Sequence, residues 1–342
     1  MTKLQKGFTL LELMIGLAIG LLVVSAATAI FLSAQRSLGF QLGMGDVQQN
    51  SNFGLAMLTH DLRHANLNTP SNQKVNNKMV GSGVIFAQEN YPSSLHANLI
   101  DDVALSQQNL QEDATTGNSD QLVIQFVPQY QVEEASDVDP NDATKKINER
   151  LLSNTDMYDC EGNRIGFTTA KKPNEDTQAI RPTMVQRYFI AKLPNSQQGS
   201  DGLDRYGLYC DAGHYNAGDS SITGLNNNAQ LLMQNIDAFK VLLGVKNPQN
   251  NQLRYVTIDQ YKTLMSSITA EKDYLQVISL QVSVVARSAT NIGADAGLNN
   301  QTITLPGAAT AVVFDGDANL NKKYIRQLVT QVVGLRNTLG AS

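Results

Sequence analysis

The sequence lacks tryptophan and has no excess of positive charge. Its 342 residues include 26 lysines and arginines against 31 aspartates and glutamates, so the net charge is -5. No basic face is evident in such a chain, and direct nucleic-acid binding is not favoured. A Ser-His-Asp arrangement and a glycine-rich phosphate loop are also absent from the sequence. The common hydrolase and nucleotide-binding signatures are therefore missing.

A long apolar run near the N-terminus is the strongest feature that is present. The 23 residues from Leu13 to Gln35 carry no charge, and a single carboxylate, Glu12, stands just before them. As a helix with ~1.5 Å rise per residue the run would be about 35 Å long, enough to cross a hydrocarbon core of roughly 30 Å. We therefore expect a membrane span with an acid near its start.

Two ordinary explanations of this segment fit poorly. A secretory signal peptide would use Lys3, Lys6 and a cleavage site near residues 27–29, but its apolar region is usually only about 7 to 15 residues long. A plain single-pass anchor has sufficient length but leaves Glu12 unexplained. Because ionisable groups inside a membrane are costly, a functional role is the default hypothesis for that residue.

The residues from Lys6 to Glu12 read Lys-Gly-Phe-Thr-Leu-Leu-Glu. This stretch resembles the leader junction of type IV pilins and type II secretion pseudopilins. The resemblance implies cleavage after Gly7 by prepilin peptidase, N-methylation of the new terminus Phe8, and pairing of Glu12 with the terminal amine of a neighbouring subunit. The pairing is physically reasonable, because a carboxylate among apolar helices is tolerated when an opposite charge meets it.

Flanking charge gives the orientation. Lys3 and Lys6 precede the span, which predicts a cytoplasmic N-terminus, a single pass through the inner membrane and a periplasmic head. Gly16 and Gly20 have the G-x-x-x-G spacing that permits close helix packing. The expected organisation is a leader at 1–7, a transmembrane and fibre-core helix at 8–36, an amphipathic half at 37–67 and a head at 68–342.

The second half of the helix carries an apolar stripe formed by Leu55, Leu58, Leu62 and Ala65. Steps of three and four place these residues on one side, suited to packing on a sheet. The glycines at 39, 43 and 45 each weaken a helix by about 1 kcal/mol relative to alanine, so we expect a bend or a melted stretch there. Asn66, Asn68 and Pro70 are expected to end the helix.

The remainder reads mainly as strands. Alternating or β-rich apolar runs occur at residues 122–127, 185–191, 239–243 and 275–286. We predict an α+β protein in which the long N-terminal helix packs on an antiparallel β-sheet head with long loops. Residues 143–152 are predicted as a short helix in a polar insertion, and residues 324–339 fit a helix and a strand equally well.

Further motifs resemble one branch of this group, the PilW-type minor pilins of type IV pili. They lie at 46–50, 58–63, 159–163, 207–210 and 333–337, while the polar insertion at 132–158 and the histidines at 60 and 64 depart from the family pattern. The resemblance implies a non-catalytic protein without a cofactor. It would prime pilus assembly at the inner membrane and end in the tip complex of a fibre at the cell surface.

Partners implied by the same resemblance are prepilin peptidase, other minor pilins and the major pilin, with a tip adhesin as a further candidate. The alternative is a type II secretion pseudopilin whose client is an exported enzyme. Cys160 and Cys210 are the only cysteines, and a periplasmic head predicts one disulfide between them. Two separate buried thiols are the other interpretation.

Three groups of residues suggest metals. His60 and His64 lie four apart on the helix, as in zinc hydrolases, but an aspartate replaces the usual glutamate and no third ligand follows, so we interpret them as solvated residues. Asp315, Asp317 and Asn319 resemble the start of a calcium loop, as do Asp137, Asp139 and Asn141. Neither stretch completes an EF-hand, and we predict no metal at either.

Overall fold

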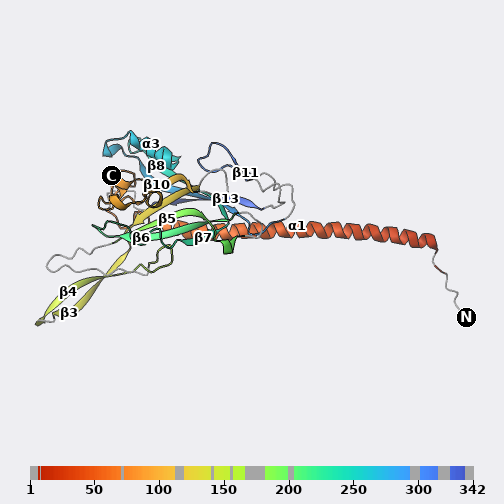
Figure 1. The fold of residues 1–342 in the computed structure, drawn as a ribbon, viewed down its shortest axis with the longest axis horizontal. Helices are drawn as coiled ribbons and strands as arrows, with labels where there is room; N and C mark the ends of the chain where they lie inside the picture. The colour runs from red at the N-terminus through yellow and green to blue at the C-terminus, as the bar shows by residue number, and fades with distance from the viewer. Residues whose placement is uncertain are drawn as a thin grey trace.

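The 53-residue helix α1 (Leu10–Leu62) is the longest element of the computed structural model, and about half of it projects from the head (Figure 1). The structure describes residues 7, 9–70, 73–111, 119–139, 142–154, 157–165, 182–198, 204–292, 301–314 and 324–335. For 130–139, 142–154 and 314 it describes the backbone alone. The helix ends near the expected place, with Asn66 and Asn68 at positive φ in the turn that follows.

Two antiparallel sheets form the head. One has the strand order β1-β2-β5-β6-β7 and the other β13-β10-β8-β9. The first comprises β1 (Gln107–Gln111), β2 (Ser119–Phe126), β5 (Thr183–Lys192), β6 (Tyr206–Tyr215) and β7 (Gln230–Gln234). The second comprises β8 (Ile236–Lys246), β9 (Leu253–Val256), β10 (Gln276–Arg287) and β13 (Arg326–Gly334).

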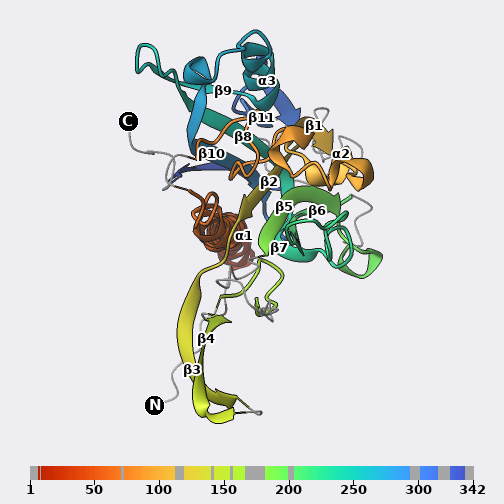
Figure 2. The same cartoon turned by 90° about the vertical axis from the view of Figure 1, so that its left-hand side faces the viewer.

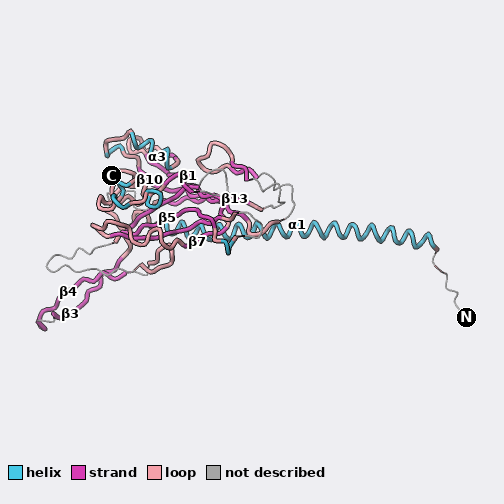
Figure 3. The backbone as a smooth tube through the Cα atoms, in the orientation of Figure 1, coloured by secondary structure: helices cyan, strands magenta, loops and turns pink. Residues whose placement is uncertain are grey.

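Smaller elements complete the head. They are α2 (Asp101–Ala104), α3 (Ile258–Ser266), the pair β11 (Gln301–Ile303) and β12 (Val312–Phe314), and the hairpin β3 (Tyr130–Asp139) and β4 (Asp142–Asn154). The hairpin extends away from both sheets, at the end of the head far from the free half of α1 (Figures 1 and 2). The predicted α+β class, a long helix on antiparallel sheets, is confirmed (Figure 3).

The four predicted strands are present as β2, β5, β8 and β10. β2 is buried along its whole length because both of its faces are covered. Leu122 and Ile124 belong to the main core beneath α1, whereas Val123 packs with Ile85 and Tyr91 in a second cluster on the opposite face. Burial on two faces explains why this strand reads as a continuous apolar run.

The structure differs from the expectation for residues 143–152 and for the glycines of α1, and it settles the ambiguous stretch 324–339. The expected helix at 143–152 is wrong, because those residues form β4, paired with β3 from Tyr130↔Asn154 onward. The ambiguous stretch 324–339 contains β13, which pairs with β10 through Val282↔Gln331 and its neighbours. Pairing with a neighbouring strand overrides the helix propensity of the lysine, glutamate and leucine residues of β4.

The expected melted stretch at the glycines is also wrong, since α1 is continuous through 39, 43 and 45. Gly43 is buried where α1 approaches the head, and a Cβ built there would lie 3.0 Å from Ile292 Cγ2 and 3.2 Å from Ile325 Cδ1. A glycine therefore allows the close approach of helix and sheet at this position. Tertiary contacts here outweigh the local propensity cost of about 1 kcal/mol per glycine.

Buried charges join the strands. Asp120 on β2 accepts hydrogen bonds from Lys240 Nζ (3.0 Å) and Val241 N (2.9 Å) on β8, so it links the two sheets. Burial raises the pKa of Asp120, and the nearby Lys240 ammonium opposes that shift. Within the second sheet, Asp237 on β8 accepts from Arg326 Nε on β13 at 2.6 Å and lies 3.5 Å from Arg287 Nε on β10.

Candidate functional site

The N-terminal half of α1 carries apolar side chains that are exposed in the described chain. Every residue from Leu10 to Leu38 is exposed, with Leu11 at 67% and Phe31 at 60%. An 18-residue window of this helix has a mean hydropathy of 2.5 and is 0% buried among the described residues. By length and composition the helix is able to cross a membrane, as the sequence predicts.

At the start of α1, Thr9 and Glu12 form a capping box. Glu12 Oε2 accepts hydrogen bonds from Thr9 N (2.9 Å) and Thr9 Oγ1 (3.0 Å), while Glu12 N donates to Thr9 Oγ1 (3.2 Å). Reciprocal bonds of this kind satisfy backbone donors that have no partner within the helix. The T-x-x-E spacing would have revealed this arrangement, which the sequence analysis missed by considering only the role of Glu12 in assembly.

The other predicted residues of this segment are placed as follows. Gly7 is exposed, and Phe8 lies outside the described residues, so the cleavage junction itself is not described. Gly16 and Gly20 lie on the bare helix, and no atom of the described chain comes within 4 Å of a Cβ built on either. Their role in packing against another helix stays a prediction.

The C-terminal half of α1 is embedded in the head. Its predicted stripe is confirmed, since Leu55, Leu58 and Leu62 are 0% exposed and Ala65 is 1% exposed. The helix contacts β7, β10 and β13 (Figure 2). Gly54 faces β7 so closely that a Cβ would overlap the Met233 side chain.

A neighbouring part of the same half remains open. Phe53 is 68% exposed and borders a groove of about 600 Å³ beside Leu231 and Leu232 of β7. Met57, one turn further along, is 41% exposed. Large apolar side chains next to a groove mark a surface suited to contact with another protein.

The predicted disulfide between Cys160 and Cys210 is present, with Cα atoms 6.0 Å apart. It fastens the loop at 157–165 to β6, and Ala212 N adds a hydrogen bond of 2.9 Å to Glu161 Oε1. Within the loop, Asp159 Oδ1 accepts from Asn163 N at 2.8 Å. Gly162 has a φ of +84°, a conformation that glycine adopts without steric cost.

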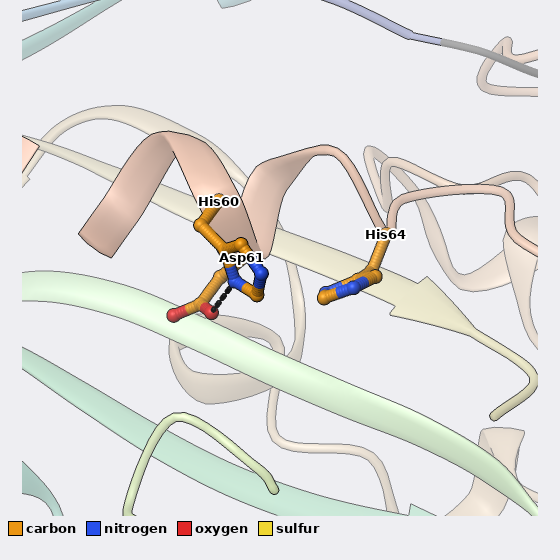
Figure 4. A group of neighbouring side chains, drawn as sticks. All are labelled: His60, Asp61 and His64. Atoms are coloured by element: carbon orange, nitrogen blue, oxygen red, sulfur yellow. Dashed lines mark hydrogen bonds and ion pairs between the residues drawn. The ribbon is translucent and has the colours of Figure 1, made fainter. Parts of the chain in front are cut away.

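A second cluster lies where α1 ends. The side chains of His60, Asp61 and His64 gather on one side of the chain, and one ligand atom from each lies within 4.8 Å of the others (Figure 4). His60 is 71% exposed, as expected for a solvated residue, but His64 is half-buried with its ring 5.5 Å from the Phe126 ring. The expectation that both histidines are merely solvated is therefore wrong for His64.

In the sequence, Asp61 is considered only as the residue that replaces the usual glutamate of zinc hydrolases, and not as a ligand. Its side chain is 18% exposed, and Oδ1 lies 3.5 Å from His60 Nδ1. Tyr188 on β5 donates a hydrogen bond of 3.4 Å to Oδ2. Burial raises the pKa of Asp61, and the interaction with His60 partly offsets that shift.

The remaining metal candidates are not tested. Asp315, Asp317 and Asn319 lie outside the described residues, as does Asn141. Asp137 and Asp139 belong to β3, for which only the backbone is described.

Comparison with known proteins gives two family matches. A model described as Type IV Pilus-assembly protein W matches residues 187–337, which run from β5 to β13 and just beyond, and one described as Prokaryotic N-terminal methylation motif matches residues 2–28. No curated protein matches the chain. Among solved structures, a type IV-like pilin from Thermus thermophilus is similar, with 15% sequence identity and a TM-score of 0.17. The aligned region covers 46% of this chain and 78% of the Thermus thermophilus chain.

A TM-score that low supports no argument, so the assignment rests on the family matches. The methylation motif coincides with the capped start of α1 and its bare apolar half, in keeping with membrane anchoring and pilus association. The second match covers most of the two-sheet head. Both agree with the resemblance found in the sequence: residues 187–337 are similar to the family described as Type IV Pilus-assembly protein W, and residues 2–28 match the prokaryotic N-terminal methylation motif.

Proposed function

We propose that this chain is a minor pilin that primes type IV pilus assembly in the inner membrane and then remains in the tip complex. The observation that carries the proposal is the division of α1 into a bare apolar half and a half embedded in the head. The bare half has a hydrophobic surface that only lipid or other helices would cover. The role is structural and involves no catalysis.

Assembly in this proposal exchanges one set of contacts for another. The bare half of α1 is held in the bilayer with the N-terminus cytoplasmic and the head periplasmic, and it then moves into the fibre core. Lipid contacts are replaced by helix contacts, for which Gly16 and Gly20 allow close approach. Phe53 and the neighbouring groove would face an adjacent subunit. The match to the family described as Type IV Pilus-assembly protein W favours a role in pilus assembly over a role as a type II secretion pseudopilin.

Glu12 would have two successive partners. In the free chain its carboxylate is held by Thr9 at the start of its own helix. During assembly we propose that it meets the methylated amine at Phe8 of a neighbour, so that a charge stored in a low-dielectric region gains an opposite charge. Prepilin peptidase, other minor pilins and the major pilin are the partners, with a tip adhesin as a further candidate.

Two substitutions at Glu12 distinguish the cap from the charge. Glu12→Gln keeps a capping box, since glutamine serves at that position, but removes the negative charge. Glu12→Ala removes both. Each variant should be processed and inserted as well as the native chain, because a costly charge has been removed from the membrane. Neither should restore piliation in a strain that lacks the native copy.

Thr9→Ala is the matched control. It removes the hydroxyl of the cap, at a cost of about 1 kcal/mol of helix stability, and leaves the carboxylate in place. This variant should support piliation. Normal piliation by the Glu12→Gln protein would show that the cap, and not the charge, is what assembly requires, and the proposed pairing would be abandoned.

The processing step has its own test. Mass spectrometry of the mature protein should find an N-terminus at N-methylated Phe8. A terminus at Thr28 or Ile30 would establish a secretory signal peptide and contradict the proposed membrane topology.

A further inference from the structure

We infer that the end of α1 holds a divalent first-row transition metal ion, of the Zn²⁺ class, coordinated by His60, Asp61 and His64. The ligand atoms of the three side chains already lie within 4.8 Å of one another (Figure 4). Neither the family matches nor the proposed assembly role assigns this cluster a task. It lies in the head, far along α1 from the membrane-spanning half.

The spacing of the donors suits a small ion. His60 lies in the last turn of α1 and His64 in the turn that follows the helix, and their ring centroids are 5.0 Å apart, so the two imidazoles are able to grip one ion between them. Zinc is bound at about 2.0 to 2.1 Å by imidazole nitrogen and at similar distance by carboxylate oxygen. The donors would therefore move inward by about 1 Å or less each. His60, which is 71% exposed, has room to make that movement.

The donor chemistry selects the kind of ion. Two imidazoles and one carboxylate suit zinc, copper or nickel, whereas magnesium and calcium prefer oxygen ligands alone. A fourth position would be left to water, because the exposed His60 lies at the solvent edge of the cluster.

The surroundings hold two of the donors in place. Tyr188 donates to Asp61 Oδ2, which leaves Oδ1 on the side of His60 Nδ1. Tyr188 is itself fully buried, and its hydroxyl also lies 2.9 Å from Gln186 Oε1, so its single proton is shared between two acceptors and the sheet fixes its position. His64 packs against Phe126. Outer groups that orient a ligand in this way are a regular part of metal sites.

Electrostatics at this point of the chain also favours a cation. The cluster lies at the C-terminus of a long helix, where the helix dipole places partial negative charge. Burial raises the pKa of Asp61, and repulsion from Asp159, in the loop fastened by the disulfide, adds a smaller contribution in the same direction. A bound cation would relieve that repulsion and tie the last turn of α1 to the turn that follows.

The test uses the full-length mature chain in detergent, purified without a polyhistidine tag and stripped with a chelator. Zn²⁺ is titrated by calorimetry, and the melting temperature is followed in parallel. Stoichiometric binding and a rise of a few degrees at about a hundred times the Kd are expected, because an ion that binds only the folded state stabilises it. Mg²⁺ at the same concentration should do neither. Co²⁺ should give the visible absorption of a site with nitrogen and oxygen ligands.

Variants locate the site. His60→Gln and His64→Gln should each weaken Zn²⁺ binding by at least about ten-fold, the lower end of the loss caused by removing even an outer-shell partner. Because His60 is largely exposed, His60→Gln should keep the melting temperature of the metal-free protein. The sequence has four histidines, so His96→Gln and His214→Gln are matched controls and should bind normally.

Three outcomes would overturn the assignment. They are the absence of stoichiometric Zn²⁺ binding, unchanged affinity in both His60→Gln and His64→Gln, and an equal loss of affinity in the two control variants. All three are read without reference to piliation, so the metal site is judged separately from the assembly role.

Discussion

Gly54→Ala is expected to destabilise the protein, because α1 and β7 touch there without room for a side chain. A Cβ built on Gly54 would overlap Met233 at Cγ, close to the backbone of that residue, and Met233 is only 1% exposed. The whole methionine side chain would have to move in a filled core, at a cost of about 1 to 3 kcal/mol. Alanine gains about 1 kcal/mol in helix propensity over glycine. The net loss should be up to about 2 kcal/mol.

Two other glycines of the same helix provide a graded control. No atom of the described chain comes within 4 Å of a Cβ on Gly45, so Gly45→Ala should stabilise by up to about 1 kcal/mol. At Gly43 the nearest atom is Ile292 Cγ2 at 3.0 Å, which predicts an effect between the other two. Thermal unfolding of the full-length chain, followed by circular dichroism in one detergent, measures the order. A Gly54→Ala protein as stable as Gly45→Ala would refute the close contact with β7.

Three further predictions concern bonds within the head. Cys160→Ser removes the disulfide, which joins residues separated by 50 positions. The free energy of unfolding should fall by about 4 kcal/mol and the melting temperature by several degrees. An unchanged melting temperature under oxidising conditions would contradict this. Asp237→Asn leaves Arg287 and Arg326 buried without their counter-charge, and denaturant unfolding should show a loss of about 3 to 5 kcal/mol, whereas a loss below about 1 kcal/mol would mean that water reaches the site. Burial raises the pKa of Tyr215 to about 12, above its unfolded value near 10. The contribution of this shift to the free energy of unfolding is therefore complete below about pH 10 and is lost as the pH rises to about 12. Tyr215→Phe should make stability fall less steeply in that interval.

The pattern of apolar residues predicts correctly those helices and strands whose structure depends on their own residues. The stripe through Leu55, Leu58 and Leu62 and the apolar run of β2 were recognised because burial repeats with the period of the element. The stretch at 143–152 was misassigned because helix-forming side chains dominate it, while its strand form depends on β3 across a turn. The continuity of α1 past Gly43 depends on Ile292 and Ile325, which lie far along the chain.

The candidate sites also divide into those formed by residues close in the sequence and those formed by residues far apart. The leader junction and the pair His60 and His64 are short-range motifs, and the sequence shows them directly. The part played by Asp61 could not be predicted, because Tyr188, which orients it, is 127 residues away. The capping box between Thr9 and Glu12 was predictable in principle, since it needs only a spacing of three.

The contact of α1 with β13 joins the first and last elements of the described part of the chain, and this has a consequence for the timing of folding. Ribosomal synthesis delivers α1 first, yet the pocket that receives Gly43 is completed by Ile325, immediately before the final strand. Until that strand arrives, one side of α1 and one edge of β10 stay uncovered, and such surfaces attract chaperones and proteases. A chain truncated before residue 324 would keep this defect permanently. The arrangement therefore couples the burial of one side of α1 to the arrival of β13.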